Sequence, residues 1–199
     1  MATQLEFFFD IGSAYSYLAS TQLPGLAART GVVVRWRPFL LGAVFKATGN
    51  DMPARIPAKA RWMMHDLQLW SHHYGVPIRV PSRFPINTLR TQRALAAIEL
   101  AGGADAVAAA ATALFRAYWI DDQDVSADAV ISACVRAAGG DGDVVVAAID
   151  APASKDHLRA STDEAIRRGA FGAPAMFLGE QLFFGNDRLP LVEAALRAR

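Results

Sequence analysis

The sequence predicts an α/β fold in which a large all-helical domain is inserted between a β-α-β half and a β-β-α half. Three observations predict it: a short aromatic run near the start, an alanine-rich middle that lacks proline, and two short apolar runs near the end. We place the three parts at residues 1–41, 42–168 and 169–199 of the 199-residue chain.

The first part contains two expected strands and one expected helix. Residues 5–10 (LEFFFD) form a nearly continuous aromatic run, which is typical of a strand buried on both faces. Apolar residues at helical spacing predict a helix over 14–29 that is kinked at Pro24. Residues 32–37 (VVVRWR) predict a second strand. Because no hairpin turn joins the two strands, we expect a parallel pair with a right-handed crossover.

The middle part is predicted to be helical throughout. Alanine, the best helix former, occupies 12 of the 25 positions between Ala94 and Tyr118, and no proline occurs between Ile86 and Ala151. Glycine pairs and an aspartate pair divide the region into several helices. The local signals predict helices over 57–74, which begins with proline, over 127–138 with Ser126 as its N-cap, and over 154–168.

The last part returns to short strands. Residues 175–178 and 182–184 are apolar runs joined by a short turn, and so predict an antiparallel hairpin. A final helix is expected over 189–199. The complete order, β-α-β, helical block and β-β-α, is that of a thioredoxin-like fold that carries a helical insertion.

Cysteine and histidine usage excludes several classes of protein. The single cysteine, Cys134, rules out an intrachain disulfide, a dithiol redox enzyme and a cysteine-rich zinc module. Its apolar surroundings predict a buried small side chain. His65, His72 and His73 share one predicted helix without metal-ligand spacing, so no metal site is expected. Four aromatic side chains are expected in the core rather than around a pocket: Tyr15, Phe45, Trp62 and Trp70.

Composition and the N-terminal segment bear on the compartment. Hydrophobic residues make up 53% of the chain and the net charge is +1, which excludes a disordered protein. The first ten residues have an early acid and no basic segment, unlike a signal peptide. Apolar runs are far shorter than the roughly 20 residues of a membrane span. We therefore expect a cytoplasmic protein without a membrane segment.

Positive charge is concentrated in the middle of the chain. Between Lys46 and Arg93, eight basic residues accompany two acidic ones, a local excess of +6. A solvated basic face and an anion-binding region are both open interpretations. Apolar residues interrupt this segment and no recognition motif is present, so nucleic acid is not an expected partner.

Ser13 and Ser16 lie where the first strand turns into the first helix, the position of Cys-x-x-Cys in redox thioredoxin folds. A helix N-terminus presents free N–H groups and a partial positive charge. A hydroxyl there can donate to the thiolate of a ligand. Lowering a thiol pKa by about 2 from its ordinary value of about 8.5 takes ~2.7 kcal/mol, which a charge-assisted hydrogen bond plus the helix terminus can supply. The other interpretation is that Ser13 is only an N-cap.

Two features near the C-terminus allow two interpretations each. An X–Pro bond is cis only about 5% of the time, so Ala173–Pro174 is either a trans proline at a strand start or the cis-proline that thioredoxin folds have there. Asn186 or Asp187 either caps the last helix or supplies a carboxylate and helix N–H groups to one edge of a ligand site.

Five segments together resemble the 2-hydroxychromene-2-carboxylate isomerase family, which is related to kappa-class glutathione transferases and, more distantly, to DsbA-type oxidoreductases. They are residues 9–19 (FDIGSAYSYLA), 46–50 (KATGN), 84–87 (FPIN), 171–174 (FGAP) and 185–189 (GNDRL). The resemblance spans essentially the whole chain in order. One departure is Ala14, where the family usually has proline. It keeps the adjacent hydroxyl but puts the rigidity of the turn in question.

The resemblance implies a glutathione site. It assigns Ser13 as the catalytic residue that holds the glutathione thiolate. It assigns the backbone of Ala173, before Pro174, to the cysteinyl part of glutathione, and Asn186 and Asp187 to its γ-glutamyl end. The residues that it implies face the second substrate are Lys46, Asn50, Asn87 and Arg90.

The implied activity is a glutathione-dependent isomerase of aromatic catabolism. It would convert 2-hydroxychromene-2-carboxylate, or a close aromatic analogue, to trans-o-hydroxybenzylidenepyruvate by reversible thiolate addition. Two other functions stay open: a kappa-like glutathione transferase, which consumes the thiol, and a non-catalytic adaptor on a degenerate thioredoxin fold. The implied partners are glutathione, a small aromatic carboxylate and a second copy of the chain in a homodimer.

Overall fold

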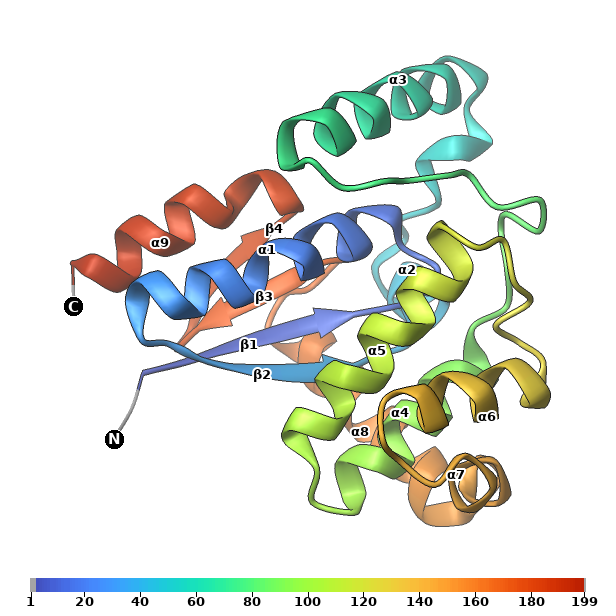
Figure 1. Cartoon of the computed structure of the whole chain (residues 1–199). Helices are drawn as coiled ribbons and strands as arrows, with labels where there is room; N and C mark the ends of the chain where they lie inside the picture. The colour runs from blue at the N-terminus through green and yellow to red at the C-terminus, as the bar shows by residue number, and fades with distance from the viewer. Residues whose placement is uncertain (1–2, 199) are drawn as a thin grey trace.

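A mixed sheet in the order β2-β1-β3-β4 forms the centre of the computed structural model, which describes residues 3–198 (Figure 1). The central strand β1 (Gln4–Phe9) pairs in parallel with β2 (Val33–Pro38) and antiparallel with β3 (Ala175–Leu178). β4 (Gln181–Phe184) completes the antiparallel hairpin. Both predicted pairings are therefore confirmed, and the sheet joins the two ends of the chain.

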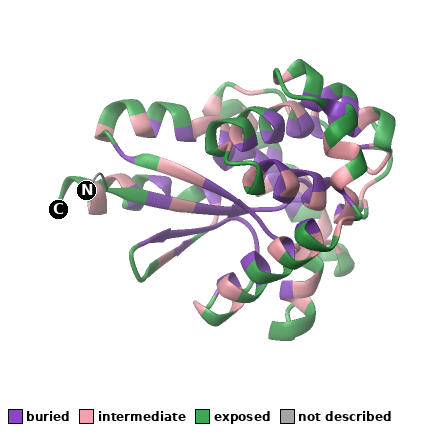
Figure 2. Cartoon of the chain, turned by 90° about the horizontal axis from the view of Figure 1, so that it is seen from below, coloured by how far each residue is buried: buried purple, intermediate pink, exposed green. Residues whose placement is uncertain are grey.

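The expected burial of the first strand on both faces is confirmed. Phe7, Phe8 and Phe9 are all fully buried. Phe7 stacks on Phe9 on one face, with ring centroids 5.3 Å apart. Phe8 belongs to the core on the opposite face, where it contacts Phe39 and Phe177 edge-on. Because β1 pairs with a strand on each side, it has no free hydrogen-bonding edge. Figure 2 shows buried residues along the strands at the centre of the sheet.

Helices cover both faces of the sheet. α1 (Ala14–Thr30) and α9 (Leu189–Arg197) lie side by side on one face, and α3 (Pro57–Tyr74) extends beyond them (Figure 1). The other helices lie between β2 and β3 in the chain: α2 (Leu41–Thr48), α4 (Leu89–Leu100), α5 (Ala104–Trp119), α6 (Asp128–Ala137), α7 (Gly142–Ala148) and α8 (Pro152–Arg167). This is a thioredoxin-like sheet with a helical insertion, as the sequence predicts.

Local signals located most helix ends and missed a few. The helix predicted over 57–74 is α3, with proline at its first turn and Gly75 in the left-handed conformation after it. Pro24 lies inside α1 without ending it. The predicted cap at Ser126 is wrong: α6 begins at Asp128, and the Ser126 hydroxyl donates to Asp124 instead. The last predicted position, 199, lies outside the described residues.

The helical insertion holds the turn between β1 and α1. Gln92 of α4 is fully buried, and its Nε2 donates to the carbonyl oxygens of Phe9 and Phe39, both at 2.8 Å. Trp119 at the end of α5 donates from Nε1 to the carbonyl oxygen of Ile11, also at 2.8 Å. These contacts fix the strand ends from which the start of α1 projects.

A buried ion-pair network joins the helical insertion to strands β1 and β2 of the sheet. Arg37 of β2 contacts Glu6 at 2.8 Å, Glu164 at 2.7 Å and Glu99 at 3.5 Å. Arg168 contacts Glu6 and Glu164 as well. The Arg37 side chain is only 7% exposed, so its charge depends on these carboxylates for solvation.

Candidate active site

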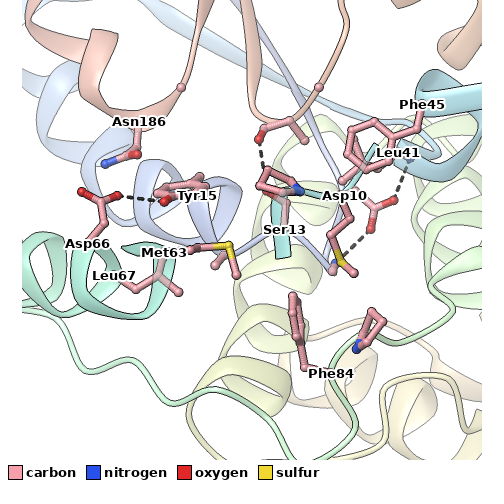
Figure 3. Close-up of a pocket in the computed structure, with 18 of the residues that line it drawn as sticks. Asp10, Ser13, Tyr15, Leu41, Phe45, Met63, Asp66, Leu67, Phe84 and Asn186 are labelled. Atoms are coloured by element: carbon pink, nitrogen blue, oxygen red, sulfur yellow. Dashed lines mark hydrogen bonds between the residues drawn. The ribbon is translucent and has the colours of Figure 1, made fainter. Parts of the chain in front are cut away.

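A cavity of about 660 Å³ lies at the N-terminal end of α1. The residues that line it come from the β1–α1 turn, α2 and its connection to α3, the inner face of α3, the connection from α3 to α4, the end of α5, and the two ends of the β3–β4 hairpin. In Figure 3, Asp66, Tyr15 and Asn186 lie on one side of Ser13, and Asp10, Leu41 and Phe45 lie on the other. The cavity thus joins residues from the first 15 and the last 15 positions of the chain.

Ser13 is both an N-cap and a cavity residue, so the two interpretations of this residue are compatible. It caps α1 by accepting a hydrogen bond from the Ser16 backbone N–H at 3.1 Å. Its hydroxyl donates to the carbonyl oxygen of Ala173 at 3.2 Å. Ser16 is fully buried, does not line the cavity, and its hydroxyl has no partner among residues 3–198. Ser13 therefore brings a hydroxyl and the positive end of a helix to the cavity.

The Ala173–Pro174 peptide bond is cis, which decides between the two interpretations of this proline. Ala173 lines the cavity, and its carbonyl oxygen accepts the Ser13 hydrogen bond. The carbonyl oxygen of Pro174 accepts from the backbone N–H of Gly185 at 3.1 Å. The proline loop is thus fixed between the start of α1 and the turn after β4.

Asn186 and Asp187 line the cavity from a short 3₁₀ turn, Asn186–Arg188, and neither caps α9. Asn186 is 2% exposed and its Nδ2 lies 3.4 Å from the hydroxyl of Tyr74, which donates back to the Asn186 carbonyl oxygen. Gly185 has φ +99°, and a Cβ there would collide with the Asp187 carboxylate. The turn therefore requires glycine immediately before the two polar residues.

Tyr15 and Asp66 form a polar contact across the cavity that sequence reasoning missed. The Tyr15 hydroxyl donates to Asp66 Oδ2 at 2.8 Å and so joins α1 to α3 (Figure 3). Burial, and then the Asp66 carboxylate, raise the pKa of Tyr15 well above its usual value. The residues are 51 positions apart, and no local pattern links them.

Asp10 is a second lining residue that the sequence did not single out. Its carboxylate accepts the Gly12 N–H and the Leu41 N–H, each at 2.9 Å. Burial raises the pKa of Asp10, although these backbone hydrogen bonds act to lower it. The carboxylate joins the turn that precedes Ser13 to the start of α2.

The expectation that four aromatic residues belong to the core rather than to a pocket is confirmed only in part. Tyr15, Phe45, Trp62 and Trp70 all line the cavity, although Tyr15 and Trp70 are also packed against the core. For Trp62 and Trp70 the reason is that α3 lies beyond the sheet, so its inner face borders the cavity instead of packing fully on the strands. Trp62 is 61% exposed and marks the mouth. By contrast, Cys134 is buried as predicted, next to the carbonyl oxygen of Ala113.

Of the four residues that the resemblance assigns to the second substrate, only Asn50 lines the cavity. Its Nδ2 donates to the Phe171 carbonyl oxygen at 2.8 Å. Lys46 is exposed on α2 outside the lining. The Asn87 side chain accepts the Leu89 N–H at the start of α4, and Arg90 is held by Asp128 and Asp150. The structure thus separates Lys46, Asn87 and Arg90 from the cavity.

The local positive charge is largely balanced by acids from later in the chain. Arg79 pairs with Asp122, and Arg83 pairs with Asp124. Both Arg90 and Arg93 contact Asp150. The excess of +6 along the sequence therefore does not become an equally cationic surface, because folding brings distant acids to these arginines.

The described residues contain neither a metal-binding cluster nor a membrane-spanning helix. Among residues 3–198, no three His, Cys, Asp or Glu side chains are grouped so that they could hold a metal ion. Within the same residues, no helix has both the length and the apolar character needed to cross a bilayer.

Comparison with known proteins agrees with this fold. Residues 4–197 match the protein family that is described as "DSBA-like thioredoxin domain". A 2-hydroxychromene-2-carboxylate isomerase of Sphingobium xenophagum is 35% identical over 98% of this chain and 99% of its own length. Human glutathione S-transferase kappa 1 is 30% identical, over 94% of this chain and 88% of its own.

A solved structure of a 2-hydroxychromene-2-carboxylate isomerase superposes on this chain with a TM-score of 0.89 at 28% identity. The match covers 98% of this chain and 95% of that one. The relatives are named as isomerases or transferases, which supports an enzymatic role. The chain belongs to the DsbA-like thioredoxin-domain family, and within it is related to the 2-hydroxychromene-2-carboxylate isomerases and kappa-class glutathione transferases.

Proposed function

We propose that the protein is a glutathione-dependent isomerase that converts 2-hydroxychromene-2-carboxylate, or a close aromatic analogue, to trans-o-hydroxybenzylidenepyruvate in aromatic catabolism. The observation that carries the proposal is the Ser13 hydroxyl, 3.2 Å from the Ala173 carbonyl oxygen in a cavity lined by both aromatic and polar side chains. The 35% identity to a protein named as such an isomerase supports it. A cytoplasmic homodimer is part of the same proposal.

The donors and acceptors around Ser13 fit glutathione. The Ser13 hydroxyl and the N-terminus of α1 suit a thiolate, because both offer positive charge to an anion. The Ala173 carbonyl oxygen suits an amide N–H of the cysteinyl part. Asn186 and the Asp187 carboxylate suit the γ-glutamyl end, which carries an ammonium group. When glutathione binds, the Ser13 hydroxyl would turn from the Ala173 carbonyl to the sulfur and free that carbonyl for the ligand.

The chain's own residues would hold the acceptor and exclude water. When bound, glutathione supplies a thiolate that adds reversibly to the double bond of the ring-opened keto acid and so permits rotation. Phe45, Phe84 and Trp119 line the cavity and would enclose the aromatic ring. Ser13 would stabilise the thiolate and does not itself attack carbon. Among the residues that line the cavity there is no histidine to act as its base.

A kappa-like glutathione transferase is the second candidate, because the human kappa relative matches at 30% identity over nearly the same length. The thiol count separates the two activities. With substrate and glutathione, an isomerase forms product at a constant thiol concentration, whereas a transferase consumes one thiol for each adduct. Stoichiometric loss of thiol with adduct formation would reject the isomerase. Absence of glutathione binding at millimolar concentration would favour the non-catalytic adaptor.

A further inference from the structure

We propose that Arg55, which no earlier assignment includes, binds the carboxylate of the aromatic co-substrate. The inference rests on the proposed function, which supplies an aromatic carboxylate as the second ligand of this cavity. Arg55 ends the short 3₁₀ turn Pro53–Arg55 between α2 and α3, and its side chain lines the cavity.

The charged residues that line the cavity identify Arg55 as the candidate partner of a carboxylate. Five charged residues line the cavity: Asp10, Asp51, Arg55, Asp66 and Asp187. Arg55 is the single cation among the described residues of the lining. A carboxylate that leaves water for this cavity needs a cationic or hydrogen-bonding partner, because burying it unpaired is costly. Lys46, which the resemblance assigns to this role, is outside the lining.

The Arg55 guanidinium is available to a ligand. Its Nε contacts Asp51 Oδ1 at 3.2 Å, and both side chains are largely exposed, at 70% and 56%. An exposed pair of this kind is weak and exchanges readily with another carboxylate. Among residues 3–198, Asp51 is the one acid in contact with Arg55, and the contact is through Nε. The two terminal guanidinium nitrogens can bind one carboxylate in the two-pronged geometry that arginine prefers.

Arg55 is distant from Asp66 and Asn186, the polar residues that lie on one side of Ser13 in Figure 3. It precedes α3, whereas Asp66 lies nine residues after Pro57 in that helix, about 14 Å farther along its axis. Phe45 of α2 lies on the other side of Ser13, together with the Asp10 carboxylate. The side with Asp66 and Asn186 suits the ammonium group of glutathione. Arg55, in the segment that follows α2, suits the carboxylate of an aromatic acid.

Glutathione also carries carboxylates, so the test must show whether Arg55 binds a carboxylate of glutathione or the carboxylate of the aromatic co-substrate. We choose trans-cinnamate as an unreactive aromatic carboxylate and cinnamamide as its neutral counterpart. Binding is measured by quenching of tryptophan fluorescence, since Trp62, Trp70 and Trp119 line the cavity. The variants are Arg55→Gln and Arg55→Lys. Arg61→Gln, an exposed cation on α3 outside the lining, is the matched control.

We expect Arg55→Gln to weaken cinnamate binding about tenfold, the effect of one charge-assisted contact. Cinnamamide binding and glutathione binding, the latter by calorimetry, stay unchanged. The cinnamate affinity of Arg55→Lys should lie between those of wild type and Arg55→Gln, because lysine keeps the charge but loses the two-pronged geometry. Arg61→Gln matches wild type. In turnover, Arg55→Gln raises KM for the acidic substrate with little change in kcat, as expected for binding that is equal in ground and transition states.

Three results would overturn the assignment. An equal loss of cinnamate and cinnamamide would mean a structural effect. A tenfold loss of glutathione affinity instead would mean that Arg55 binds a carboxylate of glutathione. A loss of cinnamate binding in Lys46→Gln but not in Arg55→Gln would return the role to Lys46. Failure of the proposed function looks different: wild type would bind cinnamate through Arg55 yet bind no glutathione or form no isomerised product.

Discussion

The hydroxyl of Ser13 donates to the carbonyl oxygen of Ala173 at 3.2 Å, although the two residues are 160 positions apart in the chain. Ser13 caps α1 at the end of the first β-α-β half, and Ala173 precedes the hairpin of the last half. The contact therefore joins the two halves of the thioredoxin-like fold at the cavity. The contact also joins two groups of the proposed glutathione site. The Ser13 hydroxyl would hold the thiolate, and the Ala173 carbonyl oxygen would accept from an amide N–H of the cysteinyl part.

Gly185→Ala is expected to weaken glutathione binding by about tenfold. A Cβ at this position collides with the Asp187 carboxylate, and φ at +99° disfavours any side chain. Asp187 must then move from the proposed γ-glutamyl site. Calorimetry measures the affinity. Gly169→Ala is the control, because φ is +93° there but no atom lies within 4 Å of the added Cβ. Equal glutathione affinity in both variants would contradict the assignment of Asp187.

Gln92→Leu is expected to destabilise the fold by about 2–3 kcal/mol in urea unfolding. The substitution keeps most of the volume but removes three buried hydrogen bonds: two from Nε2 to the carbonyl oxygens of Phe9 and Phe39, and a longer one from the Ile11 N–H to Oε1. Gln68→Leu on the exposed side of α3 should change stability by only about 0.5 kcal/mol. If the two variants are equally stable, Gln92 does not fix the strand ends.

Arg37→Met is expected to cost roughly 3 kcal/mol or more of the free energy of unfolding. It leaves Glu6, Glu99 and Glu164 close together without their shared buried cation. Arg159→Met is the control, because Arg159 and Asp156 form an exposed pair that contributes little. A wild-type stability for Arg37→Met would mean that the network is energetically neutral.

Stability should fall in acid partly through Glu164. Burial, the largest single influence, acts to raise the pKa of Glu164, but the hydrogen bond and charge of Arg37, joined by Arg168, outweigh it and lower the pKa. A lowered folded-state pKa stabilises the protein above the ordinary value of 4.5 and loses that stabilisation as pH falls through the folded-state pKa. Urea unfolding from pH 7 to about pH 3 should thus show a shallower acid loss in Glu164→Gln. An unchanged slope would contradict this.

Local signals were sufficient for most of the fold. Pro57 and Gly75 fix the ends of α3 because their backbone preferences act within one turn. The apolar runs specify the buried strands β1 and β3 and the more exposed strand β4. The position of Ser13 at a strand-to-helix turn also follows from adjacent residues. These features depend on short-range chemistry, which a sequence displays directly.

The composition of the cavity depends on contacts between distant segments. Nothing near Tyr15 predicts its hydrogen bond to Asp66, and the arginines from 79 to 93 meet their aspartates only after the helical insertion folds. The same long-range packing leaves Lys46 outside the lining and brings Arg55 into it. Charge counted along a sequence window was therefore a poor guide to charge in the cavity.

The ionisation of bound glutathione tests the central claim most directly. The thiolate absorbance of glutathione bound to wild type, titrated with pH, should give a thiol pKa of roughly 6.5 instead of the ordinary value of about 8.5. In Ser13→Ala the pKa should return most of the way to the ordinary value and turnover should fall. Ser16→Ala, whose hydroxyl has no partner among the described residues, should match wild type. An unshifted thiol in wild type, or full turnover in folded Ser13→Ala, would contradict the account.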